Sequence, residues 1–175
     1  MESSKEETLK ENENEIPSLY ADRCSDVALH QALAQSDAQK SFDKLKTLAG
    51  SWEGRFEGKP LQVSLRVTSM GNALMHEMKG DGPEDPITMF NVDGERLLLT
   101  HYCDAGNRPR MVGKVSPDGK TVEFEFLDVS GSTRFGHMQH AVFTTIDANH
   151  HVEDWTYLMP GDKPVHARMD MTRAQ

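Results

Sequence analysis

The chain has 175 residues, which is enough for one domain with a real core and hardly enough for two. Its formal net charge of −9, without a long run of Lys and Arg, makes nucleic acid and anionic membranes poor partners. No apolar run approaches the roughly 18 residues that suggest a membrane span. The hydrophobic content of 37% and the mean hydropathy of −0.62 are low for a compact domain and indicate that part of the chain is not packed.

Residues 1–35 are predicted to be a disordered acidic tail. The first 40 residues carry nine acidic and four basic side chains, and the opening "MESSKEETLKENENE" has no apolar period with which to bury surface. Ala32–Gln35, "ALAQ", is similar to a signal-peptidase site, but the residues before it are acidic and contain no apolar region. We therefore expect a cytoplasmic protein. Its two cysteines show no zinc-site spacing and fit a reducing compartment.

A short amphipathic helix is predicted to open the domain formed by residues 36–175. Ser36 stands at an N-cap position with Gln39 three residues later, which is the pattern of a capping box. Apolar residues from Phe42 to Ala49 follow the spacing of one helical face, and Gly50 stands where we expect the helix to end.

After Gly50 the apolar period changes from 3.6 to 2. Alternating segments such as Gln62–Thr68 and Val122–Phe126 are separated by turn signals such as Asp93-Gly94. We count about ten short strands. An antiparallel sheet with this many strands in one small domain hides its edges most simply by closing. The sequence therefore predicts an all-β fold, a closed up-and-down barrel with the helix packed at one end.

The helix leads directly into "LAGSWEGRF", in which Gly50 and Trp52 resemble the G-x-W signature of the calycin group. This group contains lipocalins, fatty-acid-binding proteins and nitrobindin-like haem barrels. The resemblance implies that Trp52 packs beneath an arginine of the last strand, which is Arg168 or Arg173, with cation–π stacking as the physical reason. The stretches "LTHYCDAGNRPRM" and "GHMQHAVFTTID" are similar to a bacterial lipocalin-like family of unassigned function.

A barrel of this size can hold one small ligand, and its inward side chains decide which one. If the apolar members of each strand point inward, His76, His101, Cys103 and His140 face the cavity with them. These side chains are either core residues satisfied by a neighbour or a polar patch that orients a ligand. Arg110 is either a solvated surface residue or an anion anchor at the barrel mouth, as in fatty-acid-binding proteins. The predicted ligand-binding residues are His76, Met78, Leu99, His101, Cys103, Arg110, Phe124 and His140.

The predicted function is the binding of a small, mainly apolar molecule by a monomer or homodimer. The leading alternative is a hydrolase or isomerase that uses the same cavity, with His101, Cys103 or His140 as candidate catalytic residues. The histidines and Cys103 are also permitted metal ligands, but no closely spaced motif supports a metal site, and none is predicted. No cofactor is predicted either. The resemblance to haem barrels makes His166 the candidate axial ligand, although strand alternation points His166 outward.

Overall fold

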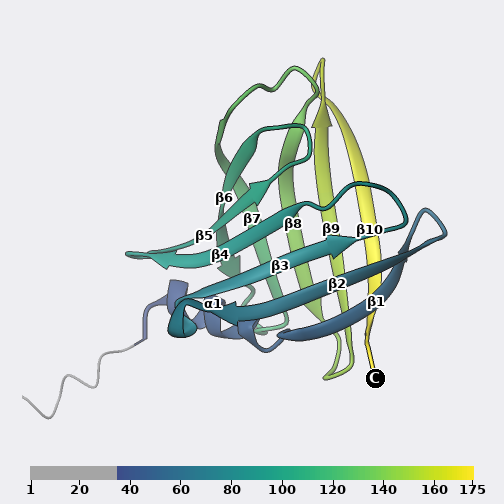
Figure 1. The fold of residues 1–175 in the computed structure, drawn as a ribbon. Helices are drawn as coiled ribbons and strands as arrows, with labels where there is room; N and C mark the ends of the chain where they lie inside the picture. The colour runs from purple at the N-terminus through teal and green to yellow at the C-terminus, as the bar shows by residue number, and fades with distance from the viewer. Residues whose placement is uncertain (1–34) are drawn as a thin grey trace, which may run out of the picture. The chain divides into compact units, whose positions relative to one another are not determined.

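Ten antiparallel strands close into a barrel over residues 35–175, the part of the chain that this computed structural model describes (Figure 1). Each strand pairs with its neighbours along the chain, and β1 pairs with β10 to complete the ring. The predicted closed barrel is confirmed, whereas the predictions for residues 1–34 lie outside the described part. The strands are β1 (Gly50–Phe56), β2 (Lys59–Thr68), β3 (Ala73–Lys79), β4 (Ile87–Asp93), β5 (Arg96–Tyr102), β6 (Arg108–Val115), β7 (Thr121–Ser130), β8 (His137–Thr145), β9 (His150–Met159) and β10 (Lys163–Arg173).

The predicted helix is α1 (Asp37–Lys46). Ser36 caps it, because its Oγ accepts a hydrogen bond from the backbone N–H of Gln39. The Gln39 side chain bonds Asp43 instead of completing the capping box. The helix ends at Lys46, four residues before Gly50, which instead begins β1 with a φ of +139°. Among residues 35–175, no helix has the length and apolar character needed to cross a bilayer.

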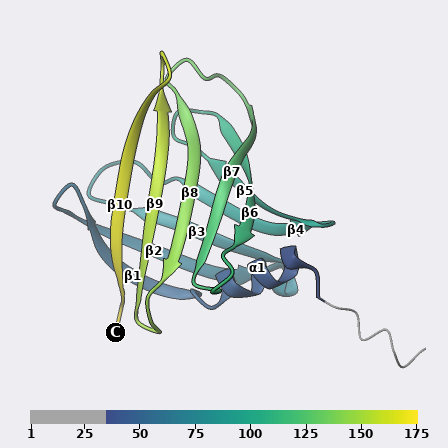
Figure 2. The same cartoon turned by 180° about the vertical axis from the view of Figure 1, so that it is seen from behind.

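Helix α1 closes one end of the barrel (Figures 1 and 2). It packs against β4, β5, β6 and β7, and it buries Phe42 and Leu45 there. Ser41 fixes the helix to the sheet, because its buried Oγ accepts a hydrogen bond of 3.1 Å from the backbone N–H of Val115. The barrel half next to the helix is filled by aromatic and aliphatic side chains, so any cavity must lie toward the other end.

The residues of the G-x-W pattern, Gly50 and Trp52, lie in β1, which pairs with β10 at the seam where the barrel closes. The guanidinium of Arg173 lies 4.1 Å from the centroid of the Trp52 ring and donates a hydrogen bond to the carbonyl of Ala49. The Trp52 indole N–H donates to the carbonyl of Leu48. The resemblance allowed either Arg168 or Arg173 to pack on Trp52, and in the structure Arg173 does so. Arg168 points outward and pairs with Asp154.

Candidate functional site

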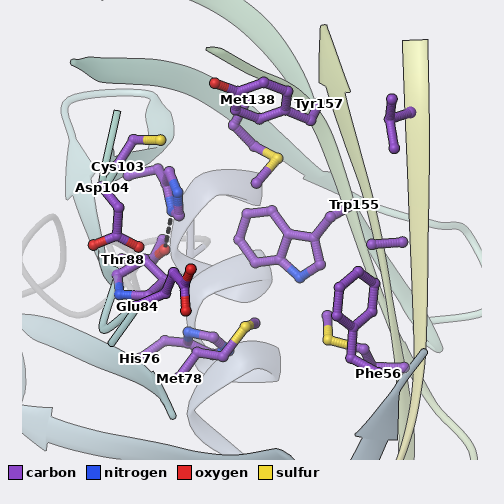
Figure 3. A pocket seen from close by; sticks show the side chains of 15 residues that line it. Phe56, His76, Met78, Glu84, Thr88, Cys103, Asp104, Met138, Trp155 and Tyr157 are labelled. Carbon is purple, nitrogen blue, oxygen red and sulfur yellow. Dashed lines mark hydrogen bonds between the residues drawn. The ribbon is translucent and has the colours of Figure 1, made fainter. Parts of the chain in front are cut away.

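The barrel half away from α1 holds a cavity of about 350 Å³. Glu84 and Pro86 of the connection between β3 and β4, and Asp104 after β5, contribute to its wall. Figure 3 shows Trp155 of β9 reaching into the middle of the space, with Tyr157 and Met138 on one side and His76 and Met78 on the other. Most of the wall is apolar, and its apolar members are Phe56, Met78, Pro86, Met138, Trp155, Val165, Ala167 and Met169.

A fully buried carboxylate lies behind the cavity wall. Glu153 of β9 accepts hydrogen bonds from Nε2 of His76 at 3.0 Å, Nε2 of His151 at 2.9 Å and the indole N–H of Trp155 at 3.1 Å. All four side chains are at most 5% exposed. The strands place them together because His151, Glu153 and Trp155 alternate along the inner face of β9, and His76 reaches across from β3.

Glu153 keeps its charge in this environment. Burial by itself would raise the pKa of the Glu153 carboxyl, but electrostatic attraction from His76 and the N–H donors of His151 and His76 outweigh it and hold the pKa well below its ordinary value. The carboxylate therefore accepts hydrogen bonds only, and its three neighbours must be the donors. It fixes the orientation of the His76 ring at the cavity wall.

His101 of β5 is the second buried histidine at the cavity. Its Nδ1 shares a hydrogen bond of 2.8 Å with the hydroxyl of Thr88, drawn as a dashed line in Figure 3. Burial, together with repulsion from His76, lowers the pKa of His101 to about 4. His101 is therefore neutral at pH 7. The ring packs 5.6 Å from Trp155, so one wall of the cavity consists of polarisable aromatic surface.

Cys103 lines the cavity near its mouth, as the sequence predicts, but it is not activated. Burial raises the pKa of the Cys103 thiol, and the neighbouring Asp104 carboxylate raises it further against a weak N–H contact from Ala105. A thiol held in its protonated form is a poor nucleophile. The chemistry expected of a reactive His-x-Cys pair is therefore not supported by these surroundings.

The sequence prediction that His140 faces the cavity is wrong. The register between β8 and β9 shifts between Met138 and His140, which makes Gln139 an extra residue in β8. Met138 lines the cavity, whereas His140 points outward and bonds Glu123 at 3.0 Å. Ala141 and Phe143 are the buried residues of this strand, so His140 and Val142 share its outer face, and the bulge turns only Met138 back to the inside.

Arg110 is also placed differently from the anion-anchor prediction. It lies on the outer face of β6 and forms a two-point ion pair with Asp128 of β7. His166 lies on the outer face of β10, exposed, with its Nδ1 3.1 Å from the hydroxyl of Thr156. The cavity wall contains neither side chain, so the haem alternative has no axial ligand at His166.

Two other predicted ligand residues point inward but belong to the packed half of the barrel. Leu99 and Phe124 are fully buried, and the rings of Phe124, Phe90 and Phe143 pack with centroids 5.4–6.0 Å apart. Neither Leu99 nor Phe124 lines the cavity. Of the eight predicted ligand-binding side chains, the structure brings together four: His76, Met78, His101 and Cys103.

Sequence reasoning missed Thr88 and Trp155 as residues of the wall and Glu153 as the carboxylate behind it. A signal was present for Glu153, since the pattern His151-x-Glu153-x-Trp155 puts a carboxylate on the same strand face as a large aromatic. A charged residue in that position is informative, because an unpaired buried charge is costly. Its partner His76 stands 77 positions away, so local spacing could not reveal the pair.

One group of side chains in the described residues has metal-ligand chemistry, and it lies on the outer surface. The ligand atoms of Glu123, Glu125 and His140 are within 4.8 Å of one another. Both glutamates are exposed, and acidic pairs of this kind are common on protein surfaces. The cavity itself does not gather such a set, because His140 is on the other side of the sheet.

Comparison with known proteins supports the architecture. No family model and no curated protein matches the chain. Among solved structures, Rv2717c from M. tuberculosis superposes with a TM-score of 0.55 at 14% identity over 77% of this chain and 98% of that one. A DUF3598-family protein of unknown function from Nostoc punctiforme gives a TM-score of 0.52 at 11% identity over 74% of this chain. The match spans 49% of the Nostoc protein, about half of its length.

At these identities the likeness concerns the fold alone. Fold and cavity together define the class of protein: a closed ten-stranded antiparallel barrel, with a helix across one end and an apolar chamber near the other.

Proposed function

We propose that this protein binds a small, mainly apolar molecule inside its barrel. The observation that carries the proposal is the chamber of about 350 Å³, whose wall is apolar except for a few positioned polar groups. Its size falls in the range of small-molecule sites, and a few convergent polar atoms in an apolar wall are the usual device for orienting a ligand. The stacking of Arg173 on Trp52 further supports the proposal that the barrel is calycin-like.

The test is fluorescence titration with a neutral apolar dye, N-phenyl-1-naphthylamine. We expect saturable binding by the full chain at one site, and loss of that binding in Ala167→Phe, because Ala167 lines the chamber. Arg168→Phe is the matched control, since the next residue points outward and its exposed ion pair contributes little. Equal binding by both variants, or no saturable binding by the unmodified protein, would contradict the proposal.

The residues expected to be catalytic support the enzymatic alternative less well than the chamber supports binding. The pKa of Cys103 is raised, His140 lies outside, and the low pKa of His101 makes it a weak base. His76, oriented by Glu153, is the side chain at the chamber best arranged for proton transfer. Turnover that is lost in His76→Leu and retained in His101→Gln would favour the enzyme over a simple carrier.

A further inference from the structure

His76 has a ring nitrogen without a partner at the wall of the chamber. Its Nε2 donates to Glu153, while its Nδ1 is buried and has no hydrogen-bond partner among residues 35–175. When Nε2 carries the only ring proton, Nδ1 is an acceptor with a free lone pair. Buried polar atoms are rarely left unpaired in proteins, and this one belongs to a side chain that lines the chamber.

His151 provides the internal contrast. Its Nε2 donates to the same carboxylate, and its Nδ1 is likewise buried without a partner. However, His151 does not line the chamber and instead packs edge-on against Trp52, with ring centroids 4.2 Å apart. Of the two unpaired nitrogens, only that of His76 belongs to a side chain that lines the chamber.

The charges around the chamber restrict the ligand further. Glu84 and Asp104 stand at its rim with exposed carboxylates, and Glu153 lies behind its wall (Figure 3). Within residues 35–175, no lysine or arginine lines the chamber. A carboxylate ligand of the fatty-acid type would meet repulsion from like charges and find no cation with which to pair.

We infer that the ligand is an uncharged, largely apolar alcohol or phenol whose hydroxyl group donates a hydrogen bond to Nδ1 of His76. The apolar body packs against Trp155 and the methionines of the wall. This inference rests on the proposed binding function and narrows it to a chemical class. It also gives the buried lone pair of His76 the partner that it otherwise lacks.

The first test uses three naphthalene derivatives that compete with N-phenyl-1-naphthylamine for the full-length protein at pH 8. They are 2-naphthalenemethanol, its methyl ether and 2-naphthoate, which share one ring system and differ in the polar group. We expect the alcohol to bind about tenfold more tightly than the ether, the effect of one net hydrogen bond. The naphthoate should bind more weakly than the ether, because its charge is repelled.

The outcomes separate the inference from the proposed function. If neither the dye nor any naphthalene derivative binds, the binding function itself is wrong. If the alcohol and the ether bind alike, the chamber is a binding site but Nδ1 of His76 does not receive a ligand hydroxyl, for example because an ordered water occupies it. If the naphthoate binds best, the assignment of an uncharged ligand is overturned.

A pair of variants locates the effect at His76. His76→Leu and His151→Leu each remove one imidazole donor from Glu153, but only His76 borders the chamber. We expect the preference for alcohol over ether to disappear in His76→Leu and to persist in His151→Leu. The opposite pattern overturns the inference. If His76→Leu does not fold, the ligand series on the unmodified protein still decides.

The rim charges are tested separately. The double variant Glu84→Gln/Asp104→Asn should tighten naphthoate binding severalfold while leaving the alcohol unchanged, because it removes the repulsion alone. Glu95→Gln/Glu123→Gln is the matched control, since it removes two exposed carboxylates that do not line the chamber. If both double variants shift naphthoate equally, the penalty comes from net charge and the rim has no part in selection.

Discussion

At the scale of single residues, His101 in the cavity wall is buried in its neutral form. His101 is buried against Thr88 and Trp155, and its pKa falls to about 4. The ordinary pKa of a histidine is about 6.5. Between these two values an unfolded chain binds a proton at this position and the folded protein does not. Acid therefore favours the unfolded state over this window.

We accordingly expect the free energy of unfolding to fall by about 3 kcal/mol between pH 6.5 and pH 4 on account of His101 alone. Urea denaturation at several pH values in this range measures how steeply the free energy of unfolding depends on pH. His101→Gln should weaken this dependence, since glutamine can bond Thr88 but does not titrate. His166→Gln, which alters an exposed histidine, should leave it unchanged. An unaltered slope in His101→Gln would show that His101 does not resist protonation.

Cys103 provides a second residue-scale prediction. Because burial raises the pKa of its thiol, alkylation by iodoacetamide at pH 7 should be slower in the folded protein than after denaturation. The measurement is made in a Cys24→Ser background, so that Cys103 alone reacts. Ligand in the chamber should slow the reaction further, because Cys103 lines it. Rapid, ligand-independent alkylation would mean an exposed and ionised thiol.

At the scale of elements, the start of β1 depends on a glycine for two separate reasons. Gly50 has a φ of +139°, and a Cβ at this position would lie 2.3 Å from Nη1 of Arg173. An alanine would strain the backbone and displace the guanidinium from both Trp52 and the carbonyl of Ala49. The glycine is thus part of the same arrangement as the arginine that stacks on Trp52.

Gly50→Ala is expected to destabilise the protein by about 2–4 kcal/mol, from backbone strain plus the lost cation–π and charged hydrogen-bond contacts. Gly58→Ala is the control, because Gly58 also has a positive φ but has open space where a Cβ would lie. It should cost about 1–2 kcal/mol. Thermal denaturation compares the two, and equal losses would mean that the position of Arg173 adds nothing to stability.

The strands also show which positions could be predicted from the sequence and which could not. Regular strands obey their alternation, so the inward positions of His76, His101 and Cys103 followed from their apolar neighbours. His140 could not be placed in this way, because both faces of β8 carry apolar residues; the inward pair is Ala141 and Phe143, and the bulge at Gln139 puts Met138 on their side. The barrel fold was predictable from period and turns, whereas the Glu153 network depends on a contact between distant strands.

At the scale of the whole molecule, a ligand bound in the chamber stabilises the barrel by mass action. At a free concentration one hundred times its dissociation constant, a ligand adds about 2.7 kcal/mol, which corresponds to a rise in Tm of roughly 10 °C for a domain of this size. We expect this rise for 2-naphthalenemethanol in the unmodified protein and none in Ala167→Phe. A rise in both would place the binding site outside the chamber.

The closure of the barrel through β1 and β10 also affects how the protein is made. The registered pairs at this seam, Trp52 with Arg173 and Glu53 with Thr172, join residues about 120 positions apart. A growing chain on the ribosome can form the meander from β2 to β9 strand by strand, but β1 has no second partner until residue 173 has left the exit tunnel. Until then an unpaired edge stays open to other chains. The ring, and with it the wall of the chamber, is therefore completed only after β10 has been synthesised.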